Sequence, residues 1–366
     1  MKAFVSAILF FLLPSIIFSQ TNRTWNDVDR TMLSTGAKKV QSIGQLSNFI
    51  NENFSHDSEK IRAMYVWLAY NIDYDTRTSD NLTREETDSE ITLKTFQKRK
   101  GICEGYAGIM DSLCQLSAIP SHIISGYTKQ EGEIDPLPHA WIAARIDSYW
   151  YLFDPTWGAG SVINNRFVQQ FDEQYFMVPP ATMINTHIPY DPIWQFLRFP
   201  MSHKTFTHSA EESENYSAMF DFNDSIDYHL QLSQKEQWEN ELRRMSENDF
   251  SNKALEIRTA FLTEALYVAG LNKSIQYFNE ATNLYNRGVS KYNDYAEFRN
   301  KNKQVSSYKG HLNRLLLEAE DSLSGTIEAL LRIQNPPGEM KQNMYVLRQN
   351  SMKLLKQIEN ERDTLN

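Results

Sequence analysis

The sequence predicts an α+β domain, in which a helix bearing a cysteine packs against an antiparallel sheet, followed by an all-α helical bundle. Two patterns predict this. Between residues 58 and 202, apolar residues at helical spacing give way to three short strands of alternating pattern. After residue 231, apolar residues recur only at helical spacing. The length of 366 residues suits two domains, and the apolar content of 41% is that of a folded protein.

The charge of the chain excludes some classes of function. The formal net charge is -9 at pH 7, and no basic run interleaved with aromatic residues offsets it. This balance argues against binding to nucleic acid or to an anionic membrane surface as the main task. We therefore expect no nucleic-acid partner.

The first 19 residues have the pattern of a signal peptide. Lys2 supplies a positive charge, Ala3–Phe18 is a nearly unbroken apolar run, and Ser19 is small enough for cleavage. The alternative is an uncleaved membrane anchor, but the run is shorter than the about 20 residues of a spanning helix and contains Pro14. We predict a secreted or periplasmic protein with no membrane span after the signal is removed.

The N-terminal part of the mature chain contains two predicted helices and a loop. Residues 20–57 are a lead-in whose better helix candidate is Ser42–Phe54. The next helix has Ser58 as its N-cap, and its apolar residues recur at helical spacing: Ile61, Met64, Tyr65, Leu68 and Ala69. Thr76–Thr92 is polar and lacks periodicity, which predicts a loop over the domain face.

A helix from Cys103 and three strands form the predicted core of the domain over residues 58–202. The helix ends before Pro120 and turns five side chains inward: Ile109, Met110, Leu113, Cys114 and Leu116. The strands are His122–Tyr127, His139–Ile146 and Tyr149–Asp154. Thr128–Pro138 is predicted to be a surface loop, and Arg166–Phe199 to close the domain.

Composition changes after residue 202, where residues 203–230 are predicted to be a linker and residues 231–366 a C-terminal helical domain. Its apolar residues divide into four amphipathic helices: Leu255–Tyr267, Ile275–Tyr285, Leu312–Leu330 and Met344–Ile358. The third ends ahead of Pro336-Pro337-Gly338. Their apolar faces are mainly core, with one face as a possible site for a protein partner.

Only two cysteines are present, which is few for an exported protein. If Cys103 and Cys114 share one helix, they lie about 16 Å apart along its axis. A disulfide needs Cα atoms within about 7 Å, so we expect two free thiols. Catalysis is one reason for an exported protein to keep a free thiol.

Cys103 has the local setting of a nucleophile. Gly101 and Gly105 flank it and permit close approach of the backbone. In the first turn of a helix, the dipole favours thiolate, and the backbone N–H of the cysteine faces a developing oxyanion. The alternative is that Cys103 is a small buried apolar residue. Cys114 lacks such flanks and is expected in the core.

The strand register brings a histidine and an aspartate to one face. With Asp147-Ser148 as a two-residue turn, Ile146 faces Tyr149, and Asp154 lies one diagonal step from His139. A slip of one residue would put them on opposite faces. Four other residues are predicted to share the face of His139: Trp141, Arg145, Trp150 and Leu152. The opposite face is predicted to hold Ala140, Ile142, Ala144, Tyr151 and Phe153.

Structural explanations exist for each residue alone: a half-buried strand histidine for His139, and a turn residue before Pro155 for Asp154. Their agreement in register with Cys103 favours catalysis, because a thiol, a base and an orienting acid are the parts of cysteine chemistry. The other seven histidines have no comparable setting, and His122 is expected to be structural. No Cys-x-x-Cys, His-Glu-x-x-His or phosphate-binding glycine loop occurs, so no metal or cofactor is predicted.

These segments resemble the transglutaminase-like superfamily, in particular its branch related to kyphoscoliosis peptidase. The matching segments are Asn71–Asp75, Gly101–Ala107, His139–Trp141, Trp150–Gly158, Asn185–Pro189 and Asp191–Gln195. The resemblance covers roughly residues 58–200 and leaves the helical C-terminus outside. One departure is Ile142, where many relatives have Asn; we expect it to affect packing more than chemistry.

The resemblance implies a papain/transglutaminase-like core with Cys103 as nucleophile, His139 as base and Asp154 as orienting acid. It also implies that the chemical step needs no metal. Trp141 and Trp157 are candidate substrate-binding residues. No motif identifies the second donor to the oxyanion.

Two functions are compatible with the sequence. The first is an exported enzyme that forms a thioester on Cys103 from a protein or peptide amide, followed by hydrolysis or by transfer to an amine. By analogy with the branch, protease or amidase activity is favoured over cross-linking. The second is a catalytically inactive scaffold that serves as a protein- or cell-wall-binding adaptor. The presence of Cys103, His139 and Asp154 together argues against it.

Overall fold

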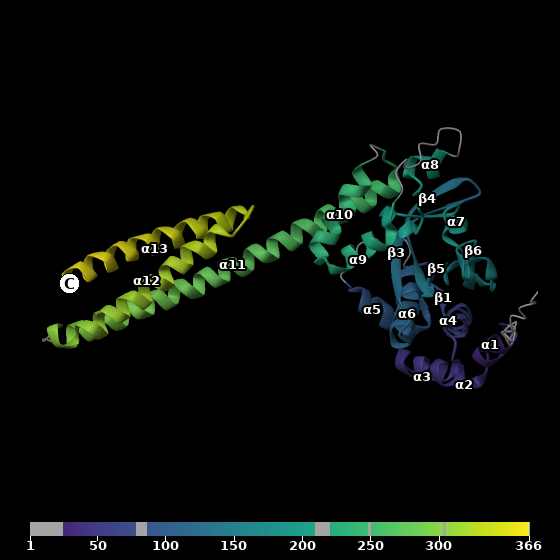
Figure 1. Ribbon diagram of the computed structural model, residues 1–366, viewed down its shortest axis with the longest axis horizontal. Coiled ribbons are helices and arrows are strands. Elements are labelled where there is room, and N and C mark those ends of the chain that lie inside the picture. Colours follow the sequence, from purple (N-terminus) through teal and green to yellow (C-terminus); the bar gives the residue numbers. More distant parts are fainter. Residues whose placement is uncertain (1–24, 78–85, 209–219, 248–249, 303–304, 366) are drawn as a thin grey trace, which may run out of the picture. The chain divides into compact units, whose positions relative to one another are not determined.

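The computed structural model describes residues 25–77, 86–208, 220–247, 250–302 and 305–365. The predicted signal peptide lies outside these residues. The chain forms two compact units (Figure 1): one comprises Met1–Pro189 and Trp194–Phe220, and the other Tyr190–Ile193 and Asp221–Asn366. The first is an α+β unit around an antiparallel sheet, and the second is helical. This agrees with the predicted fold class.

Four helices open the first unit: α1 (Trp25–Met32), α2 (Thr35–Lys38), α3 (Ile43–Asn53) and α4 (Asp57–Asn71). The α3 helix confirms the prediction for Ser42–Phe54, and the Ser42 side chain caps it by accepting from the N–H of Gln45. The α4 helix starts earlier than expected, with His56 rather than Ser58 at its N-cap. Every residue of α4 from Ile61 to Ala69 is buried, so this is the central helix of the unit.

The prediction of a loop over Thr76–Thr92 is wrong at its C-terminal end, because α5 (Asp88–Lys98) begins inside it. Thr87 and Glu90 form a reciprocal capping box, in which the Thr87 hydroxyl accepts from the N–H of Glu90 and the carboxylate accepts from the N–H of Thr87. The spacing of Thr87 and Glu90, three residues apart, is a signal for the start of a helix. The prediction missed it because it relied on apolar periodicity, which this segment lacks.

The α6 helix (Cys103–Leu116) packs closely against α5. Two glycines allow this, one just before the helix and one in its first turn. A Cβ atom at Gly101 or Gly105 would lie 2.4 and 2.2 Å from the Thr95 Oγ1 atom. The parallel pair β1 (Asp73–Tyr74) and β2 (Lys100–Gly101) leads directly into the helix. The helix buries its inner face as predicted, except that Leu116 is 57% exposed.

The main sheet has the order β5-β4-β3-β8 and is antiparallel throughout. Its strands are β3 (Ser121–Gln130), β4 (Glu133–Ile146), β5 (Tyr149–Phe153) and β8 (His187–Pro189). The predicted turn is confirmed: Asp147 and Ser148 have positive φ angles, and Ile146 pairs with Tyr149. The register holds as far as Ile142 opposite Phe153, where β5 ends.

The surface loop predicted over Thr128–Pro138 is instead a hairpin. After an irregularity between Gly126 and Thr128, β3 and β4 pair again up to Gln130 opposite Glu133. The proline content had argued against a strand. Prolines are tolerated there because β5 does not extend along this part of β4, which is therefore a sheet edge.

One face of the sheet packs on the helices. Ile142, Ala144 and Phe153 are in the same core cluster as α4 and α6 side chains, as the predicted register required. Ile142, the departure from the family pattern, is therefore a fully buried packing residue. Ala140 lies in a small separate cluster with Cys103 and Ala107.

Smaller elements complete the unit. They are η1 (Trp157–Ala159), β6 (Gly160–Ile163), β7 (Arg166–Gln169), η2 (Glu173–Tyr175), α7 (Pro180–Met183), α8 (His203–His208) and the second half of η3 (Pro192–Gln195). Of these, η1 begins three residues after Asp154, and Tyr175 of η2 packs edge-on against Trp157 of η1. The range 203–230, predicted to be a linker, contains α8 and most of α9 (Phe222–Gln231).

The second unit contains α9, α10 (Gln234–Ser246), α11 (Lys253–Lys301), η5 (Val305–Tyr308), α12 (Lys309–Leu331) and α13 (Gly338–Leu365). In Figure 1, α12 runs back along α11 and α13 along α12. The first two helices predicted here are one helix of 49 residues, because no proline interrupts it. Two of the side chains expected in its core, Phe261 and Tyr267, are 53% and 60% exposed. Among the described residues, no helix is both long and apolar enough to cross a membrane.

Candidate active site

Cys103 is the first residue of α6 and is 5% exposed. The first N–H groups of a helix have no partner within it, so the amides around Cys103 are available to an oxyanion. The thiol donates to Glu104 Oε2 over 3.3 Å. Burial and the Glu104 charge raise the pKa of the Cys103 thiol, and the nearby His139 offsets them only in part. The helix dipole that favours thiolate is therefore opposed by a neighbouring carboxylate.

His139 lies on β4, where the strand extends beyond the end of β5. Its Nε2 atom is 2.7 Å from Asp154 Oδ2, and the Cys103 thiol is a second polar neighbour that raises the pKa of the imidazole. With Nε2 on the carboxylate, Nδ1 is the nitrogen left to exchange a proton with sulfur. Burial alone would lower the pKa of the imidazole, but Asp154 raises it well above the usual value. Asp154 therefore stabilises the imidazolium that forms when His139 takes up a proton.

Asp154 directly follows β5 and is fully buried. Its Oδ1 atom accepts from the backbone N–H groups of Thr156 at 2.8 Å and Trp157 at 3.1 Å. Burial opposes ionisation, but hydrogen bonds and charge from His139 and His187 hold the pKa of Asp154 far below its usual range. Asp154 is therefore a carboxylate that orients its donors. The structure thus brings together the three residues predicted from the sequence, Cys103, His139 and Asp154.

A second histidine contacts the same carboxylate. His187, on β8, places its Nε2 atom 3.1 Å from Asp154 Oδ2. The expectation that no other histidine has a comparable setting is therefore wrong. The signal was present, since Asn185–Pro189 is one of the segments that resemble the family branch, but spacing along the chain cannot show that β8 lies beside β3.

The two candidate substrate-binding tryptophans occupy different settings. Trp141 is fully buried, its ring 5.2 Å from that of His187, and its Nε1 atom has no hydrogen-bond partner in the described part of the chain. Trp157 is half-buried, and its ring centroid lies 4.5 Å from His187 and 5.8 Å from His139. Of the two, only Trp157 has surface to offer a substrate; the substrate-binding role of both stays a prediction.

His139, Asp154 and His187 are also a possible donor set for a metal ion, since their ligand atoms lie within 4.8 Å of one another. Two imidazoles and one carboxylate suit zinc or another transition metal. In this arrangement, however, both Nε2 atoms are directed at the same Asp154 oxygen as hydrogen-bond donors. The three side chains thus satisfy one another as an orienting network.

Two further features do not resemble active sites. Cys114 is fully buried on α6, its thiol donates to Met64 Sδ, and burial raises its pKa to about 12. Both cysteines are free, as predicted.

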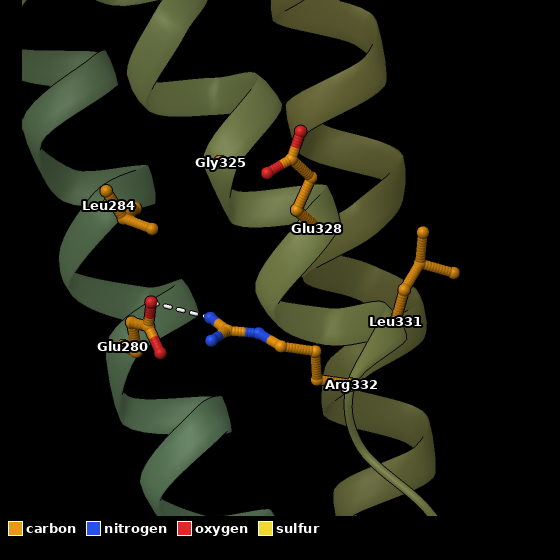
Figure 2. A pocket seen from close by; sticks show the side chains of 6 residues that line it. All are labelled: Glu280, Leu284, Gly325, Glu328, Leu331 and Arg332. Atoms are coloured by element: carbon orange, nitrogen blue, oxygen red, sulfur yellow. Dashed lines mark ion pairs between the residues drawn. The ribbon is translucent and has the colours of Figure 1, made fainter.

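Figure 2 shows a hollow in the second unit between α11 and α12, where Glu280 and Arg332 form a 2.6 Å ion pair. The other residues that line it are Leu284, Gly325, Glu328 and Leu331.

Residues 44–155 match the family model described as "Transglutaminase-like superfamily". The chain carries a transglutaminase-like domain. The matched range contains Cys103, His139 and Asp154, whereas His187 lies beyond its end. The predicted resemblance is confirmed.

Curated relatives support the same branch. Kyphoscoliosis peptidase of Homo sapiens is 32% identical over 173 residues, which cover 44% of this chain and 25% of the relative. The Mus musculus protein is 32% identical over 184 residues, or 47% of this chain and 27% of the relative. The chain thus spans about a quarter of the length of these relatives. A solved structure described as a TGase is 17% identical, covers 44% of this chain and 37% of its own, and has a TM-score of 0.27.

Proposed function

We propose that this protein is an exported cysteine-dependent acyl-transfer enzyme that acts on protein or peptide amides through a thioester on Cys103. One observation carries the proposal. The His139 Nε2 atom lies 2.7 Å from the buried Asp154 carboxylate, and the ring is near enough to the Cys103 thiol that each of the two groups shifts the pKa of the other. This is the arrangement that transfers a proton from a nucleophile and stabilises the imidazolium that results.

The proposed reaction has two halves. His139 accepts the thiol proton as the sulfur of Cys103 attacks the amide carbonyl, and the backbone N–H at the start of α6 faces the oxyanion. The C–N bond then breaks, and the leaving amine takes the proton from the imidazolium. In the second half, His139 removes a proton from water or an amine, which attacks the thioester carbonyl and returns Cys103 as a thiol.

Hydrolysis is the favoured second half, by analogy with the relatives named kyphoscoliosis peptidase. The choice between hydrolysis and transfer to an amine depends on how well the folded cleft excludes water and binds the amine. Export is proposed from the apolar run Ala3–Phe18 and its flanking residues. A protein partner for the C-terminal helices, α11 to α13, also remains a proposal.

An inactive scaffold is the second candidate function. The burial of the Cys103 thiol and its contact with a carboxylate are the observations that favour it. Cys103 is nearly buried, and its proton is directed toward a carboxylate that opposes ionisation. A scaffold keeps its partner binding in a Cys103→Ala variant, whereas an enzyme loses turnover.

The first experiment measures alkylation of Cys103 by iodoacetamide against pH, read on the Cys103 peptide by mass spectrometry so that Cys114 needs no mutation. Wild type is compared with His139→Ala. We expect wild type to react faster at neutral pH than His139→Ala, because His139 lowers the pKa of a thiol that burial and Glu104 raise. Equal curves would favour the scaffold. Labelled casein, with and without a fluorescent primary amine, then separates hydrolysis from transfer.

A further inference from the structure

The environment of Asp154 points to a fourth functional residue. We infer that His187 is a positioning residue, which holds the Asp154 carboxylate in the orientation that directs Oδ2 at His139. The inference rests on the proposed function and extends it from three residues to four. His187 lies beyond residues 44–155, the range that matches the family model.

The first argument is the number of donors that a buried carboxylate needs. Asp154 is fully buried and ionised, so each of its oxygens requires hydrogen bonds to replace water. Oδ1 has two backbone N–H donors, and Oδ2 has the two histidines. Without His187, Oδ2 keeps only His139. The carboxylate would then be less constrained in rotation, and its charge less stabilised.

The second argument is the proton on His187. The ionised Asp154 carboxylate can only accept, so a neutral His187 carries its single proton on Nε2, 3.1 Å from Asp154 Oδ2. Its Nδ1 atom is then left to accept from the Thr186 hydroxyl, which lies 2.8 Å away and is also 3.3 Å from the Met183 carbonyl. Burial lowers the pKa of His187 despite the nearby carboxylate. His187 is thus a neutral hydrogen-bond donor to Asp154. The positive charge that pairs with the carboxylate comes from His139.

The third argument is that the His187 ring is held in place. His187 pairs with Thr128 of β3, and its ring packs against Trp157 and edge-on against Trp141. Room for Trp141 depends on Gly126, where a Cβ atom would lie 2.5 Å from the indole ring. A fixed ring can impose an orientation on its hydrogen-bond partner, which a mobile surface histidine cannot.

The test compares two substitutions with opposite effects on the hydrogen bond. His187→Gln can keep an N–H donor near the position of Nε2, whereas His187→Phe keeps the ring volume and removes the donor. The readout is the rate of Cys103 alkylation by iodoacetamide against pH, with folding checked by thermal unfolding. His122→Phe is the matched control, since His122 is a half-buried histidine of the same sheet whose ring contacts those of Trp150 and Trp194 at a tilt.

We expect His187→Phe to slow alkylation at neutral pH by about ten- to a hundredfold, the usual cost of losing an orienting hydrogen bond. Its pH curve should move toward that of His139→Ala. His187→Gln should keep most of the wild-type rate, and the control should be unchanged. A packing role predicts the reverse order, with Phe tolerated better than Gln.

The two proposals fail differently. If wild type depends on His139 and a folded His187→Phe reacts equally fast, the positioning role is overturned while the proposed function stands. If wild type does not depend on His139, the proposed function fails and this inference fails with it. Should His187→Phe not fold, Thr186→Val replaces it, because that change keeps the ring and removes the donor to Nδ1. A Thr186→Val rate equal to wild type would then overturn the role.

Discussion

The thiol of Cys103 donates a hydrogen bond to the carboxylate of the next residue, Glu104, over 3.3 Å. A carboxylate so close to a nucleophilic sulfur opposes the formation of thiolate, because the two would carry like charges. The predicted advantage of a helix N-terminus is therefore balanced by a residue inside the same helix turn. Burial is the larger cause of the raised pKa of the thiol, and the Glu104 charge adds to it.

Replacing Glu104 should therefore make Cys103 more reactive. Glu104→Gln keeps the shape of the side chain and removes the charge, so the pKa of the thiol should fall. We expect the pH-rate curve for iodoacetamide to move to lower pH, with a rise of several-fold at pH 7. Glu52→Gln, at an exposed position on α3, is the control. A curve that does not move would mean that burial alone raises the thiol pKa.

Asp154→Asn should lower the reactivity of Cys103 strongly. An amide can accept at one atom only, while Asp154 is faced by four donors. Its NH₂ group must therefore face either the backbone amides or the imidazoles. We expect a loss of about a hundredfold or more in alkylation rate at neutral pH and a lower unfolding temperature. A folded variant with wild-type kinetics would remove Asp154 from the mechanism.

The pair of His139 and Asp154 should stabilise the fold most in mildly acidic solution. The folded-state pKa of His139 is raised, so its contribution is fully present below the unfolded value of about 6.5 and is lost as pH rises through the folded value. The pKa of Asp154 is lowered, so its contribution is present above about 3.9 and is lost as pH falls. The contribution of the pair to the free energy of unfolding is therefore largest between about pH 4 and 6.5.

Urea unfolding can measure this window in a Cys103→Ala background, which removes the ionisation of the thiol. The free energy of unfolding lost on His139→Gln should be larger at pH 5.5 than at pH 9. An equal loss at both values would show that His139 contributes by packing and neutral hydrogen bonds only.

Gly126→Ala should destabilise the first unit and disturb the site. A Cβ atom there would lie 2.1 Å from the Ile188 carbonyl oxygen and 2.5 Å from the Trp141 ring. Both neighbours support the position of His187. We expect a loss of about 1–3 kcal/mol in the free energy of unfolding, as for other overpacked sites. Gly44→Ala, where the nearest atom is 4.0 Å away, should be neutral or slightly stabilising.

Local signals were sufficient for the main features of the first unit. The turn at Asp147-Ser148 fixed the register of β4 and β5, and the period of a strand then placed Ile142 and Phe153 in the core. The failures have equally local causes. Thr128–Pro138 looked like a loop because of its prolines, yet the sheet edge tolerates them. The break predicted between Leu255–Tyr267 and Ile275–Tyr285 had no proline to cause it, and the helix continues.

By itself, the sequence determined which residues could do chemistry and which elements carry them. Cys103 at a helix start, His139 on β4 and Asp154 just after β5 follow from periodicity and turn type, which act over short distances. Only the tertiary structure decided that β8 lies beside β3 and brings His187 to Asp154, and that the Glu104 side chain turns toward the thiol. Strand order and side-chain rotamers are set by packing between distant segments, which no local pattern encodes.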